Sequence, residues 1–290
     1  MAAQTDDRST QDVGNIVALE HVNVRVPDQS LATLFYVVGL GLTRDPYLMV
    51  GLDNMWVNVG QQQFHLPTGA PQVVRGHVGV VLPDLAELPG RLAAIEPQLA
   101  GTKFAYAVED KHVRVVSPWG NVLRCHAPGP AFGDLTLGVP YVELTVEPGT
   151  AAGIARFYRA ALGAEAAVVG QGEGAMARVT VGPHQELVFR ETREAIPPYD
   201  RHHVQVYIAD FSGPHRWLSE RGLVTEESNW YQYRFEDIVD PDTGRVLFTI
   251  EHEVRSLRSP LYLRPLVNRN PGQRQPTYQR GRDAFVPGMA

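Results

Sequence analysis

The chain has 290 residues, of which 44% are hydrophobic and 20% are charged, so it is long and apolar enough for about two folded domains and is not disordered as a whole. The 32 acidic residues outnumber the 26 basic ones, and this balance argues against nucleic-acid binding as the main function. No apolar run approaches the ~20 residues of a membrane helix, the polar N-terminus resembles no secretion signal, and Cys125 is the only cysteine, so we expect a cytoplasmic protein.

The first half is predicted to contain two similar units after a disordered tail over residues 1–15. The runs 20–28 and 76–84 are rich in β-branched residues and end in Pro-Asp, which indicates a strand followed by a helix whose first N–H groups the Asp can cap. We expect these helices over 31–38 and 85–99. The strands expected after them are 47–50, 55–59 and 62–66, then 104–108, 113–116 and 122–125.

The second half is predicted to repeat this order twice. We expect a strand over 141–146 followed by a helix over 151–161, and later a strand over 203–208 followed by a helix over 214–221. The remaining strands expected here are 176–181, 186–189, 231–236 and 245–251. The predicted unit is therefore one strand, one helix and two or three further strands, used four times.

Short motifs of the first half return in the second half in the same order. The corresponding segments are 35–36 with 157–158, 39–42 with 161–164, 77–84 with 203–210, and the turn 117–120 with 240–244. Internal similarity at one nearly constant offset is typical of a repeated fold, so the sequence predicts a tandem duplication.

These four units, with a histidine in the first strand, a Phe-Tyr helix ending in Leu-Gly and a Pro-x-Gly turn before the last strand, resemble the vicinal oxygen chelate superfamily. That superfamily includes glyoxalase I, the type I extradiol dioxygenases and the bleomycin-resistance proteins. The resemblance covers about residues 16–253. It implies an α+β fold in which four βαβββ modules pair into two cup-shaped, glyoxalase-like domains, expected here over 16–130 and 137–254.

In this superfamily the metal ligands come from the first and last strands of paired modules. The first-strand positions hold His21, His77, Tyr141 and His203. The candidates for the last-strand positions are His65, then Arg124 or His126, then Arg190 or Glu191, and a residue within 248–251. Imidazole and carboxylate ligands suit a divalent metal ion, and two histidines with one carboxylate leave positions open for substrate.

Two ligand sets follow from these positions. One is His21, His65 and His77 in the first half. The other is His203 with Glu251, completed by His21 if the first and fourth modules pair, as they do in hydroquinone-type ring-cleaving relatives. The metal ligands expected overall are His21, His77, His203 and Glu251, with Tyr141 as the catalytic candidate.

The strand register expected from the sequence does not decide which carboxylate occupies the ligand position. In the family the carboxylate follows the turn glycine by four residues, and that position is Phe248 here. Glu251 reaches the ligand position only if a bulge shifts the register, because a slip of one residue moves a side chain to the other face of the sheet. Glu143, on the same face as Tyr141, is an alternative ligand.

The resemblance implies a metal-dependent enzyme that acts on a small oxygenated, aromatic substrate. Its most concrete version is an extradiol ring-cleaving dioxygenase with Fe(II), with Mn, Zn and Ni as alternative metals. A glyoxalase-type isomerase or lyase is the second reading, and a non-catalytic small-molecule-binding protein of the resistance type is the third. The fold does not decide between them.

Residues 255–290 differ in composition from the rest of the chain. They contain seven arginines against one acidic residue, Asp283, together with apolar residues such as Leu261, Leu263 and Phe285. We expect this segment, called the strap below, to be ordered and to pack on an acidic surface of its own domains or of a partner subunit. Contacts of this kind favour a homodimer.

Overall fold

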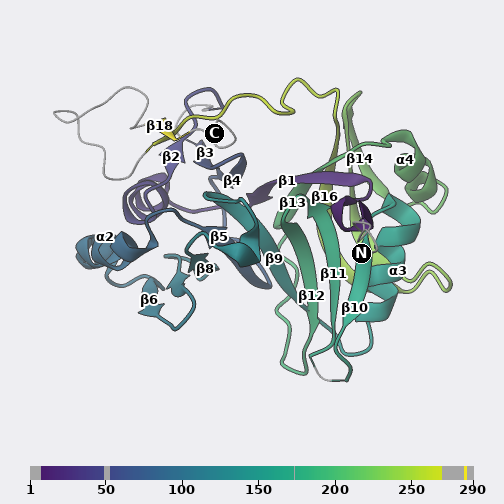
Figure 1. Ribbon diagram of the computed structural model, residues 1–290, viewed down its shortest axis with the longest axis horizontal. Coiled ribbons are helices and arrows are strands. Elements are labelled where there is room, and N and C mark those ends of the chain that lie inside the picture. Colours follow the sequence, from purple (N-terminus) through teal and green to yellow (C-terminus); the bar gives the residue numbers. More distant parts are fainter. Residues whose placement is uncertain (1–7, 49–52, 173, 270–283, 286–290) are drawn as a thin grey trace, which may run out of the picture.

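The computed structural model describes residues 8–48, 53–172, 174–269 and 284–285. It contains two eight-stranded mixed sheets with few helices (Figure 1), which confirms the expected α+β fold of paired βαβββ modules. None of the helices in the described ranges is both long and apolar enough to span a membrane.

The first sheet joins the first and fourth modules. In spatial order its strands are β14 (Val224–Asn229), β15 (Gln232–Val239), β16 (Val246–Ser256), β13 (His203–Ile208), β1 (Ile16–Asn23), β4 (Gln62–Pro67), β3 (Asn54–Val59) and β2 (Thr43–Arg44). At its centre β1 runs antiparallel to β13.

The second sheet joins the second and third modules in the same way. In spatial order its strands are β10 (Ala166–Val169), β11 (Met176–Gly182), β12 (Gln185–Glu191), β9 (Gly138–Val146), β5 (Gly76–Val81), β8 (Val122–His126), β7 (Val113–Val116) and β6 (Ala105–Val108). Here β5 runs antiparallel to β9. The expected ranges 16–130 and 137–254 therefore do not correspond to the two sheets, because each sheet takes one module from either range.

Each module carries its helix after the first strand, as expected. The helices are α1 (Gln29–Ala32) continued by the π-helix η2 (Thr33–Gly39), α2 (Leu88–Ile95) between the 3₁₀ turns η3 (Leu85–Glu87) and η4 (Glu96–Leu99), α3 (Ala151–Leu162) and α4 (Ser212–Ser219). Asp28 caps α1 by accepting hydrogen bonds from the N–H groups of Ser30 and Leu31 at 2.7 and 2.9 Å. The repeated order fits the tandem duplication, which stays a prediction.

Two glutamines connect the two sheets. Gln185 of β12 accepts a hydrogen bond from the N–H of Leu19 in β1 at 3.1 Å and donates to the carbonyl oxygen of Leu19 at 2.9 Å. In the mirrored position, Gln62 of β4 accepts from the N–H of Val139 in β9 at 3.1 Å. Since all these bonds are buried, they fix the position of one sheet against the other.

Two predicted segments differ locally from the structure. The expected strand 47–50 is wrong at Tyr47 and Leu48, because the Asp45 carboxylate accepts hydrogen bonds from both N–H groups and turns the chain; residues 49 and 50 lie outside the described residues. Within the expected tail, residues 8–15 contain a 3₁₀ turn (Arg8–Gln11), and Asn15 donates to the carbonyl oxygens of Leu162 and Asp210 at 2.9 and 3.1 Å.

The strap leaves the end of β16 and crosses to the first module (Figure 1). Arg264 pairs with the buried Asp45, and the Asn268 side chain both accepts from the N–H of Gly60 at 3.1 Å and donates to its carbonyl oxygen at 2.8 Å. Arg264 and Asn268 of the strap therefore contact the first module of their own chain. Residues 270–283 and 286–290 lie outside the described residues, so a contact with a partner subunit stays a prediction.

The pairing of modules across the two halves can be tested by cutting the chain between them. We expect that cleavage at a protease site inserted at 128–131, in the exposed connection from β8 to β9, leaves two fragments that elute together in size-exclusion chromatography. The reason is that each sheet contains strands of both fragments. Fragments that separate without denaturant would contradict the pairing.

Candidate metal centre

Three histidines meet on one face of the first sheet. His203 of β13 lies opposite Asn23 of β1, and Asn23 lies opposite His65 of β4. Side chains directly opposite each other, or two apart along one strand, lie on the same face, so His21 joins this group. One ligand atom from each of His21, His65 and His203 lies within 4.8 Å of the other two.

Glu251 of β16 belongs to the same face because it lies directly opposite His203. Its carboxylate Oε1 is 3.0 Å from His203 Nδ1. The pairing of β15 with β16 is irregular between residues 235 and 239, opposite the part of β16 that contains Glu251. Phe248, which holds the position expected for the family's carboxylate, packs instead against Phe189.

Hydrogen bonds and ring contacts hold the histidines in place. His21 Nδ1 is 2.6 Å from the Glu20 carboxylate. His65 stacks on Trp56 with ring centroids 3.7 Å apart, and its Nε2 is 2.7 Å from Asn54 Oδ1. A carboxylate on one nitrogen of an imidazole directs the other nitrogen toward a metal, and this is the usual outer support of metal-binding histidines.

Several buried polar atoms on this face have no hydrogen-bond partner among the described residues. They are His21 Nε2, His203 Nε2, Asn23 Oδ1 and both side-chain polar atoms of Gln205. Gln205 lies opposite His21 and is fully buried. Because unpartnered buried polar atoms are rare in folded proteins, this cluster fits a face built to receive an ion and its ligands.

The protonation states of His21, His65 and Glu251 also suit metal binding. Burial lowers the pKa of His21 well below its ordinary value, and burial with the nearby His21 lowers that of His65, so both rings are neutral and keep a free lone pair at neutral pH. Burial would raise the pKa of Glu251, but the hydrogen bond from His203 and the charge of Arg234 lower it below its usual value. The set is therefore three imidazoles and one ionised carboxylate.

Two arginines balance the carboxylates around this face. Arg234 of β15 pairs with both Glu251 and the buried Glu253. Arg255 lies 2.5 Å from Glu253 and 3.8 Å from Glu20. Burial raises the pKa of Glu20 to about 7, against the opposing charge of Arg255. The ion pair with Arg234 holds Glu251 beside His203.

No family model and no curated protein matches the sequence, but solved structures do match the fold. Glyoxalase I from Zea mays superposes with a TM-score of 0.56 at 15% identity, over 87% of this chain and 95% of the maize chain. A Bacillus subtilis protein described as a dioxygenase superposes with a TM-score of 0.53 at 16% identity, over 84% of this chain and 86% of that chain. The chain has the vicinal oxygen chelate fold. At such identities the likeness shows the fold and leaves the reaction open.

The vicinal oxygen chelate fold divides the expected site residues between its two sheets. His21, His65, His203 and Glu251 lie together in the first sheet. His77 and Tyr141 lie in the second sheet, so the structure does not bring them together with the others. The physical reason is the pairing of the first module with the fourth, which removes the second module from the centre.

The second sheet forms a separate polar cluster. The rings of His77 and Tyr141 lie 5.6 Å apart, and the Tyr141 hydroxyl is 2.9 Å from His126 Nε2. Glu143, the alternative ligand, is instead held by two hydrogen bonds from Arg190 at 2.7 and 2.9 Å. Glu191 accepts a hydrogen bond from the first N–H of α3 at 2.9 Å. The candidates Glu143, Arg190 and Glu191 of the third module are therefore engaged in contacts that stabilise the fold.

Four residues that support the site escaped the sequence analysis: Glu20, Asn54, Trp56 and Arg234. Glu20 precedes His21 directly, and strict strand alternation would place the two on opposite faces. A bulge between Leu19 and His21 brings the Glu20 carboxylate to the His21 ring. The signal that could have found Glu20 is the Glu-His pair itself, since a carboxylate next to a ligand histidine is a recurring support.

His77, in the second cluster, is expected to make the free energy of unfolding depend on pH. Burial lowers the pKa of His77 to about 4, whereas a histidine in an unfolded chain protonates near pH 6.5. As pH falls through this window the unfolded state takes up a proton that the folded state does not, so the free energy of unfolding decreases, by up to about 3 kcal/mol. We expect His77→Gln to weaken this decrease in urea unfolding at pH 7, 6, 5 and 4. The same pH dependence in both proteins would contradict the assignment.

Proposed function

We propose that His21, His203 and Glu251 hold a divalent metal ion, with His65 next to it, and that the protein is a metal-dependent enzyme for a small substrate with two neighbouring oxygen atoms. The observation that carries this proposal is the convergence of three histidines on one buried face, with Glu251 beside His203 and unpartnered polar atoms around them. Three nitrogens that share an ion at about 2.1 Å lie about 3.0–3.6 Å apart, because they cannot all stand opposite one another. Their ligand atoms lie within 4.8 Å of one another here, so ion binding would draw the rings together by up to about 1–2 Å.

The bound ion would supply Lewis acidity, which stabilises negative charge on substrate oxygens that bind next to each other. The protein's own residues position the ligands for this. Glu20 fixes the orientation of the His21 ring, Trp56 and Asn54 fix His65, and Arg234 holds Glu251 against His203. Such support keeps the ligands arranged before substrate arrives.

The most concrete version is an extradiol ring-cleaving dioxygenase with Fe(II); Mn, Zn and Ni are the alternative metals. His21, His203 and Glu251 are the two histidines and one carboxylate that suit Fe(II) and leave room for both substrate oxygens and for O₂. In this version the Asn54 hydrogen bond and the Trp56 stack keep His65 beside the ion. The similarity to the Bacillus subtilis protein described as a dioxygenase supports it.

The second version is a glyoxalase-type isomerase or lyase. If His65 also binds the ion, four protein ligands leave two positions on a six-coordinate metal, which suffices for two substrate oxygens but leaves none for O₂. The similarity to maize glyoxalase I supports this version. A non-catalytic binding protein is less consistent with the site, because such a role does not require ionisable ligands with supporting hydrogen bonds.

Metal content tests the proposal directly. We expect protein purified without a histidine tag to bind about one divalent ion per chain after Fe(II), Mn or Zn is added, measured by elemental analysis after desalting. His21→Ala and His203→Ala remove a ligand each and are expected to lose the metal, with unchanged circular dichroism. His77→Ala is the matched control, because His77 lies in the other sheet. Metal retained in both ligand variants would refute this site.

Reaction tests separate the two versions. We expect Fe(II)-loaded protein to consume one O₂ per molecule of a 1,2-dihydroxylated aromatic compound, measured with an oxygen electrode and by the absorbance of the ring-opened product. Glu251→Ala is expected to reduce this rate at least 100-fold, because it removes the carboxylate ligand. Isomerisation of a hemithioacetal by Zn- or Ni-loaded protein, with no O₂ consumption, would favour the glyoxalase type instead.

A further inference from the structure

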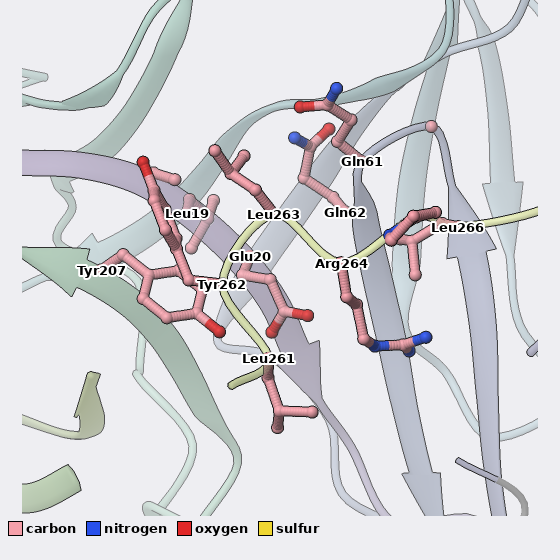
Figure 2. Close-up of a pocket in the computed structure, with 13 residues that line it drawn as sticks. Leu19, Glu20, Gln61, Gln62, Tyr207, Leu261, Tyr262, Leu263, Arg264 and Leu266 are labelled. Atoms are coloured by element: carbon pink, nitrogen blue, oxygen red, sulfur yellow. The ribbon is translucent and has the colours of Figure 1, made fainter. Parts of the chain in front are cut away.

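The strap closes a cavity of about 300 Å³ over the first sheet (Figure 2). Its floor is the middle of β1, including Leu19 and Glu20, with Tyr207 of β13 beside it. Strap residues 261–266 form the opposite wall, and the turn between β3 and β4 closes one end. This volume is at the lower end of ligand pockets and well above the ~150 Å³ of a cavity that accepts benzene.

The cavity is one side chain away from the candidate metal centre. Glu20 lines it, and the same carboxylate lies 2.6 Å from His21 Nδ1. Along β1, Ala18 lies opposite Tyr207 and His21 lies opposite Gln205. Tyr207 and Gln205 are two residues apart in one strand, so the cavity and the histidines share a face of the sheet.

The walls of the cavity are mainly aromatic and aliphatic. The Tyr207 and Tyr262 rings lie 4.8 Å apart at an angle of 60°. Leu261, Leu263 and Leu266 line the strap side (Figure 2). A tilted pair of rings with leucines around it offers a planar apolar molecule both contact area and ring-to-ring attraction.

The polar groups of the cavity favour a hydrogen-bond donor over an anion. Arg264, the cation in the cavity wall, forms an ion pair with Asp45. The pair has no net charge, so it attracts a second carboxylate only weakly. Glu20 remains as an acceptor at the floor, and a carboxyl group can accept more hydrogen bonds than the one it shares with His21. A ligand with hydroxyl groups is therefore favoured over one with a carboxylate.

We propose that this cavity binds the ring of a hydroxylated aromatic compound, with Tyr262 and Leu261 of the strap selecting for a flat ring and Glu20 accepting a hydrogen bond from a ring hydroxyl. The claim that this ligand is the substrate of the metal centre rests on the proposed function. The claim that the cavity binds it depends only on the residues of the strap and β1.

The test is calorimetric titration of the full chain with 1,2-dihydroxybenzene, after the metal has been removed with a chelator. We expect Tyr262→Ala to weaken binding about tenfold, because it removes one ring of the pair and the area around it. Tyr262→Phe keeps the ring and is expected to bind within threefold of the original protein. Tyr231→Ala is the matched control, since Tyr231 is exposed and lies outside the cavity.

A second probe and a second variant make the result decisive. trans-1,2-Cyclohexanediol carries two neighbouring hydroxyls without a flat ring, and we expect it to bind at least tenfold more weakly. Leu261→Trp fills the cavity instead of emptying it, and is expected to abolish binding even if Tyr262→Ala does not fold. Unchanged affinity in Tyr262→Ala and Leu261→Trp, or equal affinity for both probes, would overturn the cavity as a ring site.

The outcome separates this proposal from the proposed function. Tyr262-dependent binding in a protein that takes up no metal would support the cavity and refute the metal centre. The opposite outcome is metal uptake that depends on His21 and His203, together with binding of 1,2-dihydroxybenzene that does not depend on Tyr262 or Leu261. That outcome would support the metal centre and refute the cavity as a ring site.

Discussion

The antiparallel pairing of β1 with β13 is the constraint on which the site depends. It places Asn23 opposite His203 and Gln205 opposite His21, and so brings together residues from the two ends of the chain. The parallel neighbours β4 and β16 then add His65 and Glu251 to the same face. A shift of one residue in this pairing would turn the side chains of β13 away from those of β1. The same pairing places the first and fourth modules in one sheet, which the strap crosses from the end of β16 (Figure 1).

Local sequence patterns predicted the strands and helices well where an element buries one face and exposes the other. The strands that carry His21, His77 and His203 and the helices after them appear as expected. Several strands were missed, and two of them share a physical reason. β10 and β14 are edge strands whose residues are mostly exposed, so they carry no alternation of apolar and polar residues. Tyr47 and Leu48 were mistaken for a strand, because the Asp45 side chain overrides the apolar pattern there.

The sequence could identify the site positions but not their grouping. His21, His77 and His203 occupy equivalent positions in their modules, so each is an equally good candidate in the sequence. Their grouping is decided by contacts between residues far apart in the chain, such as the two hydrogen bonds between Gln185 and Leu19 and the one from Val139 to Gln62. The position of Glu251 depended on irregular strand pairing, and that of Glu20 on a bulge. Bulges change the face of a side chain without leaving a clear signal in composition.

The charges around the three histidines explain why this face suits a cation and then an electron-rich substrate. Glu20, Glu251 and Glu253 carry up to three negative charges, and Arg234 and Arg255 carry two positive ones. These five side chains together are negative by at most one charge, so a divalent ion would leave the group with a net positive charge. A buried positive site stabilises negative charge that develops on substrate oxygens more strongly than water does. The arginines thus prevent the carboxylates from cancelling the charge of the ion, while their ion pairs keep Glu251 within reach of His203.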